Sequence, residues 1–257
     1  MKRSTKTIFL LILYPFIAAA FCLLFEFNSF MSVIVFLVVP SVYFSLGIKR
    51  SVPKIIVFAI PLSLLLFIPI DYIAHTTGQW FLIDTMFPRI FGIVPIEDVI
   101  WAFFSIYFVI ALYEYFLDSR RNTQIWHARM KYCYIVCSCI FILFLLLYTL
   151  YPSALVIPFF YAWIGTVVLA IPLGLELLRR PRLFARMTVL GAYFFLFSFI
   201  YELVGLKLEW WNFPSTQFFG WVEVVGLRFP LEEFISWFVL FAACIVAYYE
   251  FLDDDEK

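Results

Sequence analysis

The motif Pro-x-acid-acid occurs twice in this sequence, starting at positions 95 and 230, and each copy opens a long apolar segment. Proline suits the first helical position and acidic residues suit the first turn, so both copies predict helix N-termini. Ionisable groups at the end of an apolar spanning helix are costly and are functional by default. The motif acids Glu97, Asp98, Glu232 and Glu233 are therefore candidate catalytic residues.

A third acidic residue precedes each motif, and a tryptophan follows that residue nine positions later. Asp71 is followed by Trp80, and Glu202 is followed by Trp211. Because acid, tryptophan and motif recur in the same order, we expect these side chains to gather at one site. Asp71 and Glu202 would orient or tune the motif acids, and the two tryptophans would line a cavity.

Carboxyl groups in a water-poor aromatic pocket suit one kind of chemistry. A carboxyl in apolar surroundings can stay protonated near neutral pH and act as a general acid, while a differently placed neighbour accepts a proton. Such a pair can protonate an alkene and hold the carbocation over aromatic faces. Aromatic residues follow the acids at helical spacing, namely Trp101 and Phe104 after Glu97, and Trp237 and Phe241 after Glu233. The two stripes start from different acids of the pair, so the pattern leaves open which acid faces the pocket.

Cofactor motifs are missing from the sequence. It has no Gly-rich dinucleotide loop, no P-loop and no lysine in the middle of an apolar segment. Its two histidines are His75 and His127, and its five cysteines lie in apolar runs without metal-type spacing. His75 follows Asp71 by four residues and is placed to pair with it. We therefore predict chemistry that needs neither a metal nor an organic cofactor.

Membrane-spanning helices must position these residues. Of the 257 residues, 65% are hydrophobic and 14% are charged, a balance that suits lipid rather than water. Eight apolar runs are long enough to span the hydrocarbon core, at about 7–27, 30–48, 54–74, 95–117, 132–151, 154–177, 187–206 and 230–251. The predicted fold is an all-α, multi-pass integral membrane protein with eight transmembrane helices surrounded by membrane lipid.

The positive charges indicate how these helices are oriented. Of the 18 Lys and Arg residues, 15 fall at the termini or in alternate connections that share one side. The exceptions are Arg89, Lys207 and Arg228. The positive-inside rule therefore places both termini in the cytoplasm. The formal net charge is zero, so no nucleic-acid partner is indicated.

The chain also repeats itself. The spacing of 135 residues between the motifs divides it into a first membrane repeat at 1–118, a cytoplasmic loop at 119–131 and a second repeat at 132–257. Each repeat holds four predicted helices, an even number, so both enter the membrane from the same side and are parallel. Both sets of acids then lie at the outer side, where they can face one another across a central site.

The duplicated pattern of an acid-ending helix, a loop with Trp and Gly, and Pro-x-acid-acid resembles the lycopene cyclase domain family in its single-chain, two-repeat form. The resemblance covers about residues 54–118 and 182–253. It implies a plasma-membrane isomerase of carotenoid biosynthesis that cyclises the linear ψ end groups of lycopene to β-type rings, giving γ- and β-carotene. It also implies that the carotenoid is bound from within the bilayer and that the four motif acids carry the reaction. The first motif departs from the family because Asp98 is its second acid, which shortens the reach of that carboxyl.

Two other function classes are compatible with the pattern. Paired intramembrane acids in parallel repeats also suit a proton-coupled carrier of an apolar molecule, although no predicted helix shows the clear mid-membrane break expected there and Pro61 and Pro172 are weak candidates for one. A related carotenoid enzyme, such as a fifty-carbon cyclase or a hydratase, would form the same cation and differ in its fate. The ring type, the number of ends cyclised and the oligomeric state are not indicated.

Overall fold

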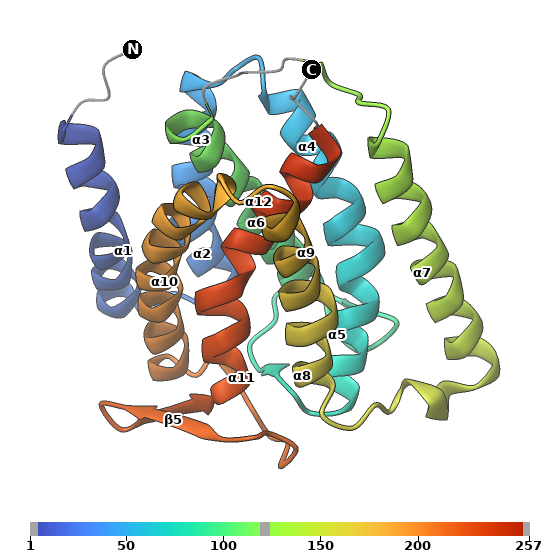
Figure 1. Cartoon of the computed structure of the whole chain (residues 1–257). Helices are drawn as coiled ribbons and strands as arrows, with labels where there is room; N and C mark the ends of the chain where they lie inside the picture. The colour runs from blue at the N-terminus through green and yellow to red at the C-terminus, as the bar shows by residue number, and fades with distance from the viewer. Residues whose placement is uncertain (1–4, 119–123, 254–257) are drawn as a thin grey trace.

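The computed structural model describes residues 5–118 and 124–253, and its main feature is a bundle of long helices (Figure 1). Within these ranges, eight helical spans are long and apolar enough to cross a membrane. They confirm the eight spans predicted from the apolar runs. The basic residues at 2–3, positions 119–123 of the loop predicted at 119–131 and the acidic tail at 254–256 lie outside the described residues.

The two halves of the chain contribute four spans each. The first four are α1 (Thr5–Phe25), α2 with α3 (Ser29–Val33 and Val39–Gly47), α4 with α5 (Val52–Ile60 and Phe67–Thr76) and α6 (Ile96–Phe116). The last four are α7 (Met130–Leu150), α8 with α9 (Phe160–Trp163 and Ile171–Arg179), α10 (Leu183–Lys207) and α11 with α12 (Leu231–Glu233 and Phe241–Asp253). A 3₁₀ turn at Pro152–Leu155 follows α7. Helices α1 and α7, which begin the two halves, both start at the end of the bundle where α12 finishes (Figure 1).

Four spans contain a π-helical segment, in which one extra residue widens the turn. These segments are Ile34–Val38, Pro61–Leu66, Ile164–Ala170 and Phe234–Leu240. The first three lie at or just before a proline, which has no N–H and whose ring clashes with the carbonyl four residues earlier. The helices run on through Pro61 and Pro172 instead of breaking there. The fourth segment contains no proline and follows the second pair of motif acids directly.

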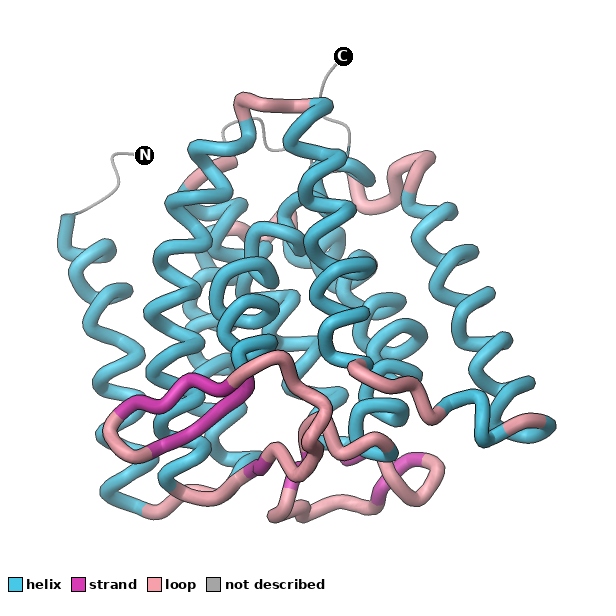
Figure 2. The backbone as a smooth tube through the Cα atoms, turned by 60° about the horizontal axis from the view of Figure 1, so that its bottom comes forward, coloured by secondary structure: helices cyan, strands magenta, loops and turns pink. Residues whose placement is uncertain are grey.

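Short strands take up part of the connections that the sequence predicted as loops, and they lie together at one end of the bundle (Figure 2). They pair antiparallel as β1 (Phe81–Leu82) with β4 (Trp211–Asn212), β2 (Arg89–Ile90) with β3 (Val94–Pro95), and β5 (Trp221–Val224) with β6 (Leu227–Pro230). The pairing satisfies backbone groups beside an apolar bundle end, where unpaired ones would be costly. Because β1 and β4 come from different halves, this pairing joins the two halves next to the motif acids.

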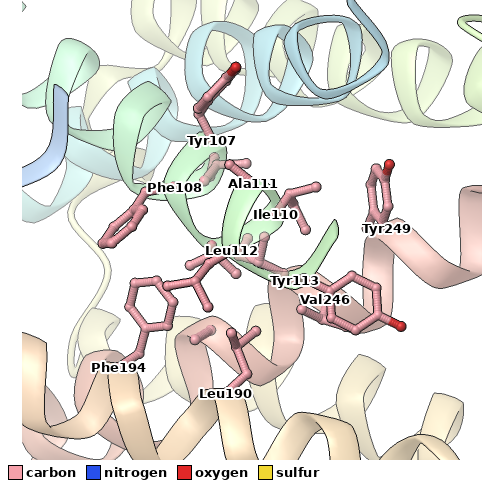
Figure 3. Packing of buried hydrophobic residues seen from close by; sticks show 14 of the residues in the cluster. Tyr107, Phe108, Ile110, Ala111, Leu112, Tyr113, Leu190, Phe194, Val246 and Tyr249 are labelled. Atoms are coloured by element: carbon pink, nitrogen blue, oxygen red, sulfur yellow. The ribbon is translucent and has the colours of Figure 1, made fainter. Parts of the chain in front are cut away.

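Helices α6 and α12 lie at the centre of the bundle. Over an 18-residue stretch of each span, 72% of the residues are buried in α6 and 56% in the span of α11 and α12, against 22% in α1 and 17% in α7. Figure 3 shows this core, in which Phe108 and Leu112 of α6 face Leu190 and Phe194 of α10. The outer helices α1 and α7 carry many exposed large apolar side chains, as expected of helices that face lipid. The two motif-bearing spans are thus held rigidly by their neighbours.

A buried polar network joins α6 and α12 at the end remote from the strands. The Tyr113 hydroxyl donates to Glu250 of α12, and the Tyr249 hydroxyl donates in return to Glu114 of α6. Lys54 of α4 completes it, with its Nζ 3.1 Å from Glu114 Oε1 and both side chains fully enclosed. Since the tyrosine–glutamate bonds are reciprocal, they connect corresponding positions of the two halves.

Candidate active site

The carboxyl-bearing helix ends of both halves meet at the end of the bundle that carries the strands. Helices α5 and α10 end there, and α6 and α11 begin there (Figures 1 and 2). They surround a cavity of about 110 Å³ that is partly open to the surroundings. Glu97, Asp98, Glu202 and Glu233 all line this cavity. Acids from both halves therefore share one space, while Asp71 and Glu232 lie behind its wall.

Aromatic side chains form most of the cavity wall. The wall contains Phe67, Trp80, Trp101, Phe194, Phe197, Tyr201, Trp211, Phe213, Trp237, Phe238 and Phe241. Trp101 and Trp237 meet edge to face with ring centroids 5.2 Å apart, one from each half. The four tryptophans predicted to line the site are all present in the wall, as is Phe241. Phe104 is not, because its ring packs against Phe103 and Tyr107.

Each acid that precedes a motif is hydrogen-bonded by the tryptophan nine residues later. Trp80 Nε1 donates to Asp71 Oδ1 at 2.7 Å, and Trp211 Nε1 donates to Glu202 Oε1 at 3.0 Å. Asp71 is fully buried and Glu202 is 4% exposed. The indole N–H is a donor without acceptor capacity, so each bond fixes the direction of one carboxyl oxygen. The sequence spacing of nine thus corresponds to the same contact in both halves.

The same backbone turn ends α5 and α10 and makes these contacts possible. The Gln79 N–H donates to the Ala74 carbonyl at 2.8 Å, and the Trp210 N–H donates to the Gly205 carbonyl at 2.9 Å. The residue before each donor has a positive φ, 68° at Gly78 and 57° at Glu209. This is a Schellman-type helix end, which reverses the chain and turns the tryptophan back onto its own helix.

The first acid of each motif holds the preceding connection in place. Glu97 Oε1 accepts the backbone N–H groups of Met86 and Phe87 at 2.5 and 2.9 Å. Glu232 Oε1 accepts the N–H of Phe219 at 2.6 Å. Glu97 is 1% exposed and Glu232 is 5% exposed. Each of these two glutamates therefore fixes the connection that precedes its own motif.

The second acid of the first motif belongs to a cluster with a histidine. Asp98 Oδ2 lies 3.6 Å from His75 Nε2, and His75 Nδ1 lies 3.2 Å from Asp71 Oδ1. The Leu82 N–H also points at Nε2, at 3.4 Å. When His75 is neutral, its Nδ1–H can donate to Asp71 and its Nε2 can accept from the Leu82 N–H. When His75 is protonated, Nε2 also carries a proton, and that proton faces Asp98. His75 is thus placed to exchange a proton with Asp98.

The second acid of the second motif has a different partner. The Tyr161 hydroxyl of α8 donates to Glu233 Oε2 inside the buried region. The Tyr161 ring also packs edge to face on Trp80, with centroids 5.1 Å apart. Glu233 therefore receives a neutral hydroxyl donor at the place where Asp98 faces an imidazole.

The π-helical segment Phe234–Leu240 explains why the two aromatic stripes started from different acids. A π-type turn inserts one residue into an α-helix without breaking it. Before the segment, corresponding residues of the halves are 135 apart, as in Asp98 and Glu233. After it they are 136 apart, as in Trp101 and Trp237, whose rings are in contact. Asp98 and Glu233 are therefore corresponding acids of the two halves, and both line the cavity together with Glu97 and Glu202.

A metal ion has one candidate position among the described residues. Ligand atoms of Asp71, His75 and Asp98 lie within 4.8 Å of one another. Both ring nitrogens of His75 already face a carboxylate, however, so an ion would have to displace one of these contacts. The donor set is better described as an ion-paired cluster than as an open ligand set with a free imidazole nitrogen.

Several site residues were not predicted from the sequence. Tyr161, Tyr201 and the cavity-lining serines Ser29, Ser105 and Ser198 are among them. Tyr161 lies in a span that shows almost no residue-level match to the first half, so the repeat carried no signal for it. The packing of α8 alone places Tyr161 beside Glu233.

Comparison of this chain with protein-family models, with curated proteins and with solved structures finds no match.

Proposed function

We propose that the protein is a multi-pass plasma-membrane carotenoid cyclase, similar to the lycopene cyclase domain family. It would convert the linear ψ end groups of lycopene to β-type rings without oxidation or reduction. The observation that carries the proposal is the single aromatic cavity lined by carboxyl groups from both halves of the chain. Protonation of an alkene requires a buried acid, an acceptor for the departing proton and a wall that does not trap the cation.

The aromatic wall supports the cationic part of this chemistry. Trp101, Trp237 and Phe241 meet one another with centroids 4.9 to 6.4 Å apart, and all three line the cavity. Ring faces attract a positive charge within about 6 Å of the centroid.

A second, apolar space supports the binding of a long hydrocarbon. It is lined by residues of both halves and shares Phe67, Trp101, Trp237 and Phe241 with the acid-bearing cavity. No charged residue lines it within the part of the chain that the structure describes. An end group in the first space can therefore be followed by polyene chain in the second once the shared side chains adjust.

The placement in the membrane belongs to the same proposal. We infer two parallel repeats with both termini in the cytoplasm, from the basic residues in alternate connections. The starts of α1 and α7 at one end of the bundle agree with this direction (Figure 1). The cavity then lies at the outer side, within reach of a carotenoid dissolved in the bilayer.

The test is pigment analysis of bacteria that accumulate lycopene and express this chain. Chromatography with absorption and mass detection should show γ- or β-carotene at the mass of lycopene. A variant with all four motif acids changed to amides, present in the membrane at the same level, should leave lycopene unreacted. Wild-type-like product from that variant would refute the mechanism. Lycopene untouched by the unmodified protein would refute the substrate assignment, and proton flux in vesicles would then test the carrier alternative.

A further inference from the structure

The two halves of the site are alike in fold and unlike in chemistry. The first half places an imidazole beside its cavity-facing acid, because His75 follows Asp71 by one helical turn. At the corresponding place in the second half, four residues after Glu202, the chain has Leu206. The partner of the second cavity-facing acid is instead a phenol hydroxyl. This difference gives the two acids different tasks.

We propose that Glu233 donates the proton that starts ring closure and that Asp98 accepts the proton that ends it, with His75 positioning and stabilising the Asp98 carboxylate. This inference rests on the proposed cyclisation and assigns a direction to it. It goes beyond the motif, in which both acids occupy the same position.

Asp98 has a cationic partner that Glu233 lacks, although the Asp71 and Glu97 carboxyl groups also lie near it. A protonated His75 would face Asp98 through Nε2 and Asp71 through Nδ1, so one positive charge serves two carboxylates. An opposite charge within about 4–6 Å favours the ionised form of a carboxyl group. Asp98 also keeps part of its side chain open to the cavity, 17% exposed, so it can reach a bound molecule.

The surroundings of Glu233 favour its protonated form. Within residues 5–118 and 124–253, no Lys, Arg or His nitrogen lies within 4.0 Å of the Glu233 carboxyl group. The nearest acidic neighbour in the cavity wall is Glu202, which also lacks a cationic partner there. Two carboxyl groups in one apolar space do not both ionise readily. Glu233 is hydrogen-bonded to the neutral Tyr161 hydroxyl and is therefore a better proton donor than Asp98.

The proposed step is balanced in atoms and electrons. The proton of the Glu233 carboxyl group adds to the CH carbon of the terminal double bond, whose electron pair forms the new C–H bond. The resulting tertiary cation is attacked by the next double bond along the chain, which forms the ring. The Asp98 carboxylate then takes the proton from the ring carbon that has just formed the ring-closing bond, next to the new cation, and that C–H electron pair becomes the ring double bond of the β ring. Asp98 ends protonated, Glu233 ends ionised, and one proton returned through the open side of the cavity resets the site.

Product analysis of single variants in the lycopene-accumulating host tests the assignment. Glu233→Gln removes the donor, so we expect lycopene consumption to fall by about 100-fold or more. Asp98→Asn leaves the donor intact, so consumption should continue while the share of β-rings falls about tenfold or more. The cation would then lose a different proton, giving γ- or ε-type rings, or capture water and gain the mass of water. His75→Gln should shift the ring ratio in the same direction, a change that general destabilisation would not produce.

Controls separate this inference from the proposed function and from folding defects. The unmodified protein in isolated membranes, supplied with unlabelled lycopene in D₂O, should add one deuterium per ring. Absence of any cyclisation by it would refute the function rather than the roles. Glu209→Gln changes an exposed carboxyl at the same end of the bundle and should leave products unchanged. Asp98→Ser provides the same test if Asp98→Asn does not accumulate in the membrane. Altered products from Glu233→Gln, or unreacted lycopene from well-expressed Asp98→Asn and Asp98→Ser, would overturn the assignment.

Discussion

Gly205 gives the most direct structural test of how the site is held. A Cβ atom at this position would lie 2.2 Å from Cζ2 and 2.3 Å from Cη2 of Trp211. Carbon atoms in contact sit about 3.5–4.0 Å apart, so Gly205→Ala must push the rigid indole away by about 1 Å or more. The same indole donates to Glu202 at 3.0 Å, and that bond does not survive a shift of this size.

The expected loss follows from the broken hydrogen bond. A buried carboxyl oxygen left without its donor costs about 1–3 kcal/mol, which corresponds to about a 5- to 150-fold change in an equilibrium or rate. We therefore expect Gly205→Ala to lower lycopene conversion by roughly tenfold or more and to lower the unfolding temperature in detergent.

Gly191 is a matched control on the same helix. A Cβ there would come no nearer than 4.0 Å, to the Val239 carbonyl oxygen. Gly191→Ala should therefore leave conversion unchanged and stabilise the helix by about 0.5–1 kcal/mol. Tryptophan fluorescence, thermal unfolding and pigment analysis on both variants give the comparison. Equal activity and equal stability of the two variants would refute the reasoning that Trp211 must lie against α10.

Three further predictions concern stability and cofactors. Lys54→Met leaves the Glu114 charge buried at the remote end of α6 without its ion pair to Lys54. We expect a loss of about 3–5 kcal/mol in unfolding free energy, which adding Glu114→Gln should partly recover. A thermal scan in micelles that finds Lys54→Met as stable as the native chain would contradict this. Glu209 and Gly78 both have a positive φ, which glycine adopts without strain. Glu209→Gly should therefore raise the unfolding free energy by about 0.5–1 kcal/mol, and Gly78→Ala should lower it. Unfolding temperatures that shift in the same direction in both variants would argue against a backbone cause. A strong chelator should leave lycopene conversion by the purified protein unchanged, because both ring nitrogens of His75 face carboxylates. Loss of activity that a divalent metal restores would show that an ion binds among Asp71, His75 and Asp98.

Much of the fold could be predicted because its determinants are local. A run of about 20 apolar residues must form a helix in lipid, whatever its neighbours are. Pro95 and Pro230 start helices for reasons that lie within the first turn, and the acids that follow them are placed by that start. The repeat then predicted that both helix starts lie at the same end, and the structure has them there (Figure 1).

The roles within each acid pair could not be predicted, because they depend on one inserted residue. In the sequence, the aromatic stripe follows Glu97 in one half and Glu233 in the other. An α-helical period cannot show that Phe234–Leu240 is π-helical, since a widened turn is stabilised by packing against neighbouring helices and not by its own residues. Only the folded chain shows that Glu97 holds a loop through one carboxyl oxygen while Asp98 lies against His75.

The sequence by itself determined the eight spans, the duplicated acids and the equal spacing of a tryptophan from each preceding acid, because helix length and helix start depend on residues within a few turns. The tertiary structure alone decided what surrounds the two cavity-facing acids. It brings Tyr161 of α8 to Glu233, places His75 against Asp98 and turns Phe104 away from the cavity. These contacts join residues that are distant in the chain or on different helices, and their geometry is set by how the helices pack.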